Sequence, residues 1–122
     1  MNKYFLDTYA IVEIIRGNEK YRRFLKFELF TSIFNLYEMY YVLLRDFNDT
    51  MAKKYFFQFK RLVFQIKDEH VFLASQIKFD NKKQRLSYAD CLGYSICLNE
   101  EMLFLTGDKE FKNFEQVEFV PR

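Results

Sequence analysis

The sequence is poor in the residues that divide a chain into parts. It contains one Pro, at position 121, and only three Gly in 122 residues. No Gly- or Ser-rich linker, internal repeat or low-complexity tract interrupts it. Its length falls in the commonest size range of one domain, about 100–150 residues. The sequence therefore predicts a single domain over residues 1–122.

Long hydrophobic runs and paired cysteines are also missing. No apolar stretch approaches the ~20 residues that a membrane helix needs. The opening MNKYFLDTY places an acid where a signal peptide has its apolar region. Cys91 and Cys97 lie on one expected helix with a separation of about 9 Å along its axis, beyond the ~7 Å limit for a disulfide. We expect a cytoplasmic protein without membrane segments, in which both cysteines are free.

Aromatic residues are abundant. There are 16 Phe and 9 Tyr, and half of all residues are hydrophobic, which is enough for a compact core packed largely with Phe. The formal net charge of +2 is only mildly basic. Composition alone therefore does not indicate a nucleic-acid-binding protein.

Hydrophobic patterning predicts short strands that alternate with helices. Apolar, β-favouring runs predict strands at 3–6, 29–33, 63–66, 102–106 and 117–120. Helical periodicity predicts helices over 8–16, 19–26, 35–46, 50–61, 68–79, 88–99 and 108–114. Asp49 or Thr50 is expected to cap the helix at 50–61. The alternation is typical of an α/β sandwich with a central parallel sheet of about four to five strands.

Four acidic residues lie at or near the ends of hydrophobic runs. Asp7 follows KYFL, Glu38 lies one helical turn past ELFTSIF, Asp90 follows SYA, and Asp108 follows MLFLTG. Taken singly, Asp7 and Asp108 suit helix caps, Asp90 completes a Ser-x-x-Asp capping box, and Glu38 could face solvent. The ends of parallel strands meet at one edge of a sheet, so together the four favour a pocket for a hard cation such as Mg²⁺ or Mn²⁺.

In these motifs the sequence resembles the PIN domain family, in particular its small VapC-type toxins, over residues 3–120. YFLDTYAIVEII is similar to the first motif, a strand that ends in Asp followed by Thr. FTSIFNLYEMYYVL is similar to the second, a strand and then a helix that carries Glu. LSYADCLGYSIC and MLFLTGDKEF resemble the third and fourth. Each motif is weak alone, whereas the four in this order are specific.

The resemblance implies a PIN-like three-layer α/β/α sandwich and an endoribonuclease that depends on Mg²⁺ or Mn²⁺ and cleaves by metal-activated water. It implies that Asp7, Glu38, Asp90 and Asp108 are the catalytic, metal-binding acids, with Asp7 and Asp90 as direct ligands. Thr8 and Thr106 would position these acids, although each also suits a cap or turn. The family further implies a toxin–antitoxin pair, with a cognate antitoxin as partner and a homodimer.

A basic cluster precedes the third motif. Lys82, Lys83 and Arg85 lie just before Asp90 and are candidates for contacts with RNA phosphates, although a solvated surface is equally consistent. Tyr88 could stack on a base, although we expect its aromatic side chain to pack in the core. His70, the only His, is expected at the surface or partly buried rather than as a ligand.

Aromatic residues on the helices at 35–46 and 50–61 exceed what one core face needs. They form a candidate surface for the dimer or the antitoxin, and burial inside the monomer is the alternative. The residues of this surface are Tyr37, Tyr40, Tyr41, Tyr55, Phe56, Phe57 and Phe59.

Three other functional classes remain as alternatives. An aspartate-nucleophile phosphatase needs a second Asp two residues after the first, where this chain has Tyr9. A phosphoreceiver domain needs an acidic pair before the first helix and a Lys at a strand end, and neither is convincing here. A non-catalytic PIN-fold RNA-binding or scaffold protein typically lacks one acid, whereas all four are present. Metal-dependent cleavage separates this last class from the nuclease.

Overall fold

Four parallel strands form the centre of the computed structural model, which describes residues 2–122. β1 (Lys3–Leu6) pairs with β2 (Glu28–Phe30) on one side and with β3 (Leu103–Thr106) on the other. β4 (Val117–Phe119) pairs with β3, which gives the strand order β2-β1-β3-β4. From β1 the chain therefore passes to β2 at one edge of the sheet, and from β3 it passes to β4 at the other edge. The boundary between β1 and β3 is the topological switch point, where open parallel sheets bind ligands.

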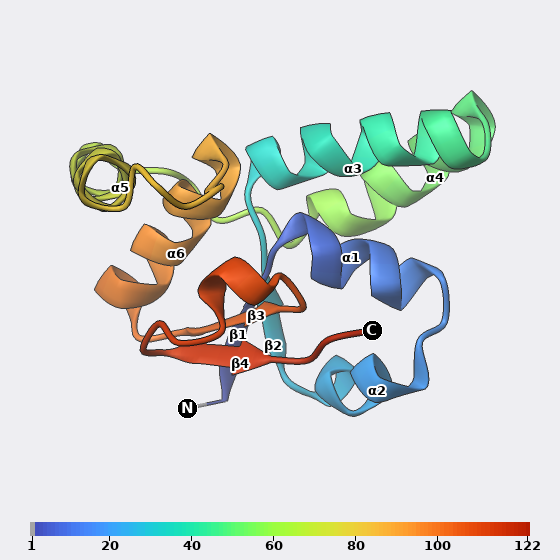
Figure 1. The fold of residues 1–122 in the computed structure, drawn as a ribbon. Helices are drawn as coiled ribbons and strands as arrows, with labels where there is room; N and C mark the ends of the chain where they lie inside the picture. Colours follow the sequence, from blue (N-terminus) through green and yellow to red (C-terminus); the bar gives the residue numbers. More distant parts are fainter. Residues whose placement is uncertain (1) are drawn as a thin grey trace.

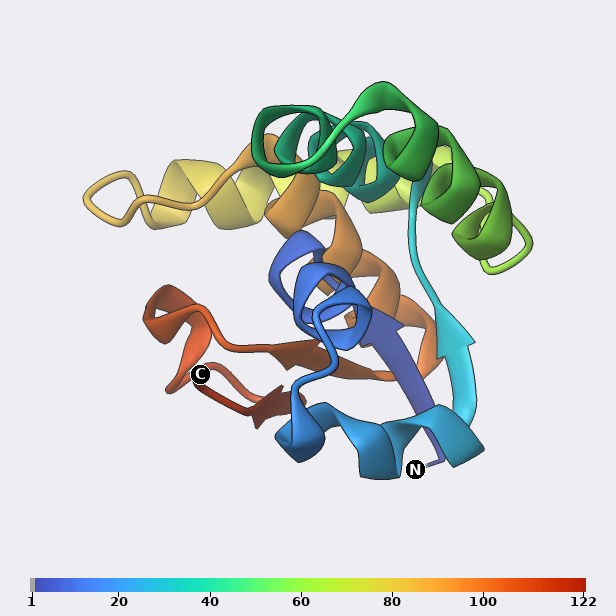
Figure 2. The same cartoon turned by 90° about the vertical axis from the view of Figure 1, so that its right-hand side faces the viewer.

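Alternating strand residues supply two hydrophobic cores, one on each face of the sheet. Tyr4, Leu6 and Leu105 pack in the first core with α1 (Thr8–Ile15), α2 (Glu19–Arg22) and the 3₁₀ turn η1 (Arg23–Lys26). Phe5 and Phe104 pack in the second core with α6 (Tyr88–Glu100) and α5 (Asp68–Asp80). Figure 2 shows α1 in front of the sheet and α6 behind it. The predicted three-layer α/β/α sandwich is confirmed.

The remaining helices lie beyond the carboxyl ends of the strands. α3 (Ile33–Asp46) and α4 (Asp49–Lys60) form a pair that lies above α1 in Figure 1. The arrowheads of β1 and β2 point toward this pair in Figure 2. A short 3₁₀ turn, η2 (Lys109–Phe111), follows β3. Helices α1, α3 and α6 thus surround the strand ends at which the four acids were expected.

Gly93 explains how closely α6 approaches the sheet. A Cβ atom at this position would lie 2.4 Å from a ring carbon of Phe5, which is on the central strand. Real Cβ contacts are longer than this, so a larger residue would push α6 away from the sheet. The first turn of α6, which carries Asp90, is therefore held near the end of β1.

The prediction of a strand at 63–66 was wrong. Only Val63 makes an isolated parallel bridge, with Thr31, just past the end of β2. Thr31 bonds through its N–H to Leu62 and through its carbonyl to Phe64, and Ser32 then caps α3 and turns the chain away from the sheet. The β-favouring residues that follow consequently have no neighbouring strand to pair with.

Several other boundaries differ from the predictions. α3 begins at Ile33 because Ser32 caps it, and α4 is capped by Asn48, whose side chain accepts from the N–H of Met51, rather than by Asp49 or Thr50. The predicted helix 19–26 divides into α2 and η1, and the predicted helix 108–114 shortens to η2. Within residues 2–122, no helix has the length and apolarity needed to cross a membrane.

Candidate active site

Asp7 occupies the centre of the switch point and is almost completely buried, at 1% exposure. It directly follows β1 and caps α1, because its Oδ1 accepts a hydrogen bond of 2.8 Å from the N–H of Ala10. Its Oδ2 accepts a bond from the hydroxyl of Thr106, the last residue of the neighbouring strand β3. Asp7 therefore caps α1, as expected, and also lies at the centre of the strand ends where the acids meet.

The Thr106 hydroxyl connects two of the acids. It donates to Asp7 and accepts a 2.9 Å bond from the backbone N–H of Asp108. Asp108 in turn caps η2, with Oδ1 2.9 Å from the N–H of Glu110. Gly107 lies between them, where a Cβ atom would stand 2.0 Å from the ring of Tyr9. The turn after β3 therefore depends on a glycine and a hydroxyl to place Asp108 beside Asp7.

Glu38 is held by a chain of polar side chains from α3 and α1. Thr8 donates a 2.7 Å hydrogen bond to Glu38 Oε1, and the amide of Asn35 donates to the Thr8 hydroxyl at 3.3 Å. Ser32 donates to Asn35 Oδ1 at 2.6 Å, and both Ser32 and Asn35 are buried. The sequence interpretation missed these last two residues. The Ser-x-x-Asn spacing at the junction of the predicted strand 29–33 and the helix after it is the signal that could have identified them.

Asp90 lies in the first turn of α6, where Ser87 caps the helix by accepting a 3.0 Å bond from the Asp90 N–H. Burial raises the pKa of Asp90 to about 7, with the nearby carboxylates of Glu38 and Asp108 adding to the rise and the Ser87 hydroxyl opposing it. Burial, together with the charge of Asp90, also raises the pKa of Asp7 well above its usual value, against the hydrogen bonds from Thr106 and Ala10. The four acids, brought from four segments, thus share one electrostatic environment.

The oxygen donors fit a hard divalent cation. Within residues 2–122, none of the four acids forms a salt bridge with Lys, Arg or His, so no protein cation neutralises them. Crowded carboxylates of this kind are stabilised by protons or by a metal ion. No group of three His, Cys, Asp or Glu side chains in the described chain is close enough to form a ready-made metal cage. An open set of carboxylates suits Mg²⁺, which keeps several of its waters.

A cavity of about 400 Å³ opens beside Glu38. Thr8 and Glu38 form its polar part, and Tyr37, Tyr41 and Val42 form the rest of its wall. A larger cavity of about 540 Å³ lies between α5 and α6 and does not include the acids. Of the four acids, Glu38 is thus the one that lines this cavity, beside two tyrosines of α3.

The basic loop before α6 is attached to the segment that carries Asp108. The Gln84 amide donates to the Glu110 carbonyl at 3.2 Å, and the Arg85 N–H donates to a Glu110 carboxylate oxygen at 3.2 Å. Lys82, Lys83 and Arg85 are exposed, and none of them forms a salt bridge within the described part of the chain. Three cationic side chains are thus available to an anion near the site.

Two expectations about single residues were wrong. Tyr88 does not pack in the core but is 77% exposed. His70 is completely buried, where Nδ1 accepts a 3.0 Å bond from the Lys67 N–H and Nε2 lies 3.2 Å from Glu100. It stabilises the start of α5 and lies outside the acidic site.

Both cysteines are free and buried, as expected, and burial raises the pKa of Cys91 to about 11, so this thiol is unreactive at neutral pH.

Comparison with known proteins gives a consistent family. The model of the PIN domain family matches residues 4–117. VapBC2 from Rickettsia felis, solved bound to a DNA fragment from its promoter, is 18% identical with a TM-score of 0.73 over 98% of both chains. VapC20 from Mycobacterium tuberculosis, described as a Sarcin-Ricin loop cleaving toxin, is 16% identical with a TM-score of 0.73 over 98% of both chains.

A third structure, VapBC-1 from nontypeable Haemophilus influenzae, is 15% identical with a TM-score of 0.74 over 98% of this chain and 97% of the other. No curated protein matches the sequence. At these identities the solved structures establish the shared fold, and the family model establishes the family.

Proposed function

The chain belongs to the PIN domain family, and from this premise we propose that it is a Mg²⁺- or Mn²⁺-dependent endoribonuclease. The observation that carries the proposal is the convergence of Asp7, Glu38, Asp90 and Asp108 at one switch point. The pKa values of Asp7 and Asp90 are raised, and among residues 2–122 no cationic side chain is paired with any of the four acids. Such a site has unsatisfied negative charge that a divalent cation would neutralise.

Each acid has a distinct role in this proposal. Asp7 and Asp90 would hold the metal directly, because they are the two whose protonation a cation would displace. Glu38 and Asp108, which are partly exposed, would bind it through water or orient the attacking water. When bound, the metal would activate that water and stabilise the charge that develops on the phosphodiester. Thr106 and Thr8 would fix the rotamers of Asp7 and Glu38 through the bonds they donate.

Lys82, Lys83 and Arg85 would bind the RNA backbone, since they form no salt bridge with any described residue and their loop is attached next to Asp108. Phosphate contacts from such residues make binding dependent on salt.

We further propose that the protein is the cytoplasmic toxin of a toxin–antitoxin pair and that it forms a homodimer. The solved VapBC2 and VapBC-1 structures support an antitoxin partner. The aromatic surface on α3 and α4 supports a protein contact, because Tyr37, Tyr41 and Phe57 are 74%, 63% and 66% exposed. Phe59 is buried within the monomer, and Tyr40, Tyr55 and Phe56 are half-buried.

Cleavage of a panel of fluorescent RNAs, including structured loops, tests the proposal. Reactions contain Mn²⁺ or Mg²⁺, with EDTA as the metal-free control. Asp7→Asn and Asp90→Asn remove one charge each with little change in volume, and Glu101→Gln is the matched control, because Glu101 is exposed and lies before β3, at the other end of the strand. We expect metal-dependent cleavage that both site substitutions abolish and the control retains.

A non-catalytic RNA-binding or scaffold protein of the same fold is the alternative. It would bind RNA without cutting it, and its binding would survive both Asp→Asn substitutions. Cleavage that persists unchanged in Asp7→Asn would contradict the nuclease site proposed here.

A further inference from the structure

Tyr88 is an aromatic side chain held in place at the surface. It is the first residue of α6 and is 77% exposed. The Lys78 ammonium, from α5, lies 4.6 Å from the centre of its ring, and the same ammonium donates a 2.5 Å hydrogen bond to the carbonyl of Leu86. Lys78 therefore covers one face of the ring and ties it to the loop before α6. The other face is open to a ligand.

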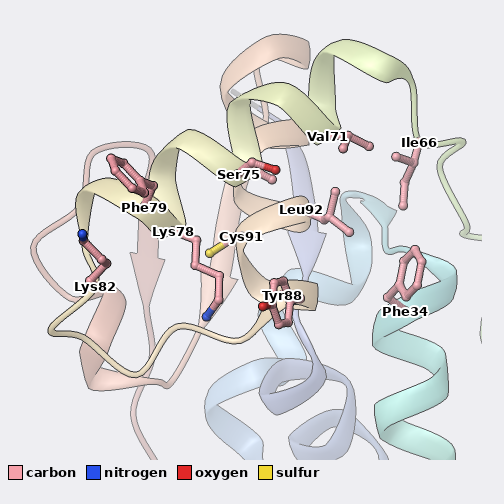
Figure 3. A pocket seen from close by; sticks show the side chains of 11 residues that line it. Phe34, Ile66, Val71, Ser75, Lys78, Phe79, Lys82, Tyr88, Cys91 and Leu92 are labelled. Atoms are coloured by element: carbon pink, nitrogen blue, oxygen red, sulfur yellow. The ribbon is translucent and has the colours of Figure 1, made fainter.

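The larger cavity adjoins this ring. It has a volume of about 540 Å³, and apolar side chains, among them Phe34 and Leu92, form most of its wall. Figure 3 shows Lys78 between Tyr88 and Lys82, with Phe34 on the far side of Tyr88. Phe79 is 63% exposed there, with the Lys82 ammonium 4.5 Å from its ring centre. Pockets that bind small organic groups have volumes of about 300–1,000 Å³, so the space is ample for a planar base.

The charges around the cavity select an anionic, aromatic ligand. Lys78 and Lys82 line the cavity, and neither forms a salt bridge with a carboxylate in the described residues. Exposed rings interleaved with unpaired cations are the pattern with which proteins bind single-stranded nucleic acid, in which bases stack on the rings and phosphates meet the cations. An apolar protein segment would leave these cations without partners.

The position on α6 relates this surface to the acids. Tyr88 and Asp90 lie in the same first turn, and the helical rotation of about 100° per residue sends their side chains to opposite sides of the helix. An RNA strand that crosses the N-terminal end of α6 can contact both Tyr88 and Asp90. The nucleotide that reaches Tyr88 is then not the one whose phosphate faces the acids.

We propose that Tyr88 stacks on an unpaired base of the RNA substrate, beside the cavity between α5 and α6, while Lys78 and Lys82 contact the adjoining phosphates. This inference rests on the proposed nuclease function and adds to it a residue that determines specificity. The substrate would need an unpaired nucleotide at a fixed distance from the cleaved bond.

Binding of fluorescent single-stranded RNA in EDTA, measured by anisotropy, tests the inference without cleavage. Tyr88→Ala removes the ring, Tyr88→Trp keeps a stacking surface, and Phe72→Ala removes another exposed aromatic, 71% exposed on α5. Base–aromatic stacking is worth ~1–3 kcal/mol, so we expect Tyr88→Ala to weaken binding by roughly 5- to 150-fold. Tyr88→Trp and Phe72→Ala should stay within about twofold of the unmodified protein. An abasic site removes one base from an oligonucleotide. When the missing base is the one that stacks on Tyr88, the unmodified protein and Tyr88→Ala should bind equally well. At every other position, Tyr88→Ala should still bind more weakly.

The outcomes separate this inference from the nuclease proposal. If the unmodified protein and Tyr88→Ala bind and cut RNA equally well, the stacking role is wrong while the nuclease survives. If no RNA binds to the unmodified protein, both are wrong. Sedimentation velocity of the same variants identifies the competing occupant. A dimer that dissociates in Tyr88→Ala, with RNA affinity unchanged, would assign the surface to a second copy of the chain and overturn the inference.

Discussion

Replacement of Asp90 by Asn should make the metal-free protein more stable at alkaline pH. The pKa of Asp90 is raised from its usual 3.8 to about 7 by burial and by the charges of Glu38 and Asp108. Below pH ~4 this carboxyl is neutral in both folded and unfolded chains. Between these two values the folded protein holds a proton that the unfolded chain has lost. Its stability therefore falls as the pH rises through this window, and the loss is complete above pH ~7.

The size of the effect follows from the shift. About three pKa units at ~1.4 kcal/mol each set an upper limit of about 4 kcal/mol on the cost of ionising Asp90. Asp90 keeps part of its contact with solvent, which screens the neighbouring charges, so we expect about half of that limit. Asp90→Asn, which cannot ionise, should be about 2 kcal/mol more stable than the unmodified protein at pH 8 in EDTA, by the same linkage.

Urea unfolding at pH 4, 6 and 8 in EDTA, followed by circular dichroism, measures this difference. The gain of Asp90→Asn should be largest at pH 8 and smallest at pH 4, where the folded carboxyl is protonated and the unfolded one has only begun to lose its proton. Glu101→Gln should show no such trend, because its side chain is exposed and distant from the acids. A gain that is equal at all three values, or a destabilisation at pH 8, would refute the electrostatic reasoning.

Three further predictions concern the neighbourhood of the site. Thr106→Val removes the hydroxyl that joins Asp7 to the Asp108 N–H and should lower kcat by about 10- to 100-fold, with RNA affinity unchanged in equilibrium binding. Gly107→Ala forces a Cβ atom against the Tyr9 ring and should destabilise the fold by about 1–3 kcal/mol in urea titrations. The double change Lys82→Ala and Lys83→Ala should reduce the slope of log affinity against log salt by about 1.4, whereas an unchanged slope would exclude both lysines from phosphate contact.

The sequence was most informative where function depends on strand ends. Asp7 and Asp108 follow short apolar, β-favouring runs that were predicted as strands, so their place at one sheet edge follows from the parallel pairing of those strands. Glu38 was placed one helical turn past such a run, and Asp90 by its spacing from Ser87 and by its resemblance to the third PIN motif. These are local signals, which is why all four acids could be located before the fold was known.

What the sequence did not indicate depends on tertiary neighbours. Val63 has a β-favouring context, yet the sheet offers it one bridge only, and the strand cannot extend. Asn35 is polar and was not expected to matter, but it is buried between Ser32 and Thr8. Tyr88 is a large aromatic residue, which favours burial, yet it is the first residue of α6 and is exposed, with Lys78 packed on its ring. Burial of one side chain depends on its partners, which periodicity does not specify.

Binding of Mn²⁺ tests the central claim most directly. Mn²⁺ titrations followed by electron paramagnetic resonance, at pH 6 and pH 8, would compare the unmodified protein with Asp7→Asn, Asp90→Asn and Glu101→Gln. A metal ion that displaces protons from Asp7 and Asp90 should bind more tightly at pH 8 than at pH 6. Each Asp→Asn change should weaken it, and Glu101→Gln should not. Mn²⁺ affinity that is independent of pH and unaffected by both site substitutions would contradict the account.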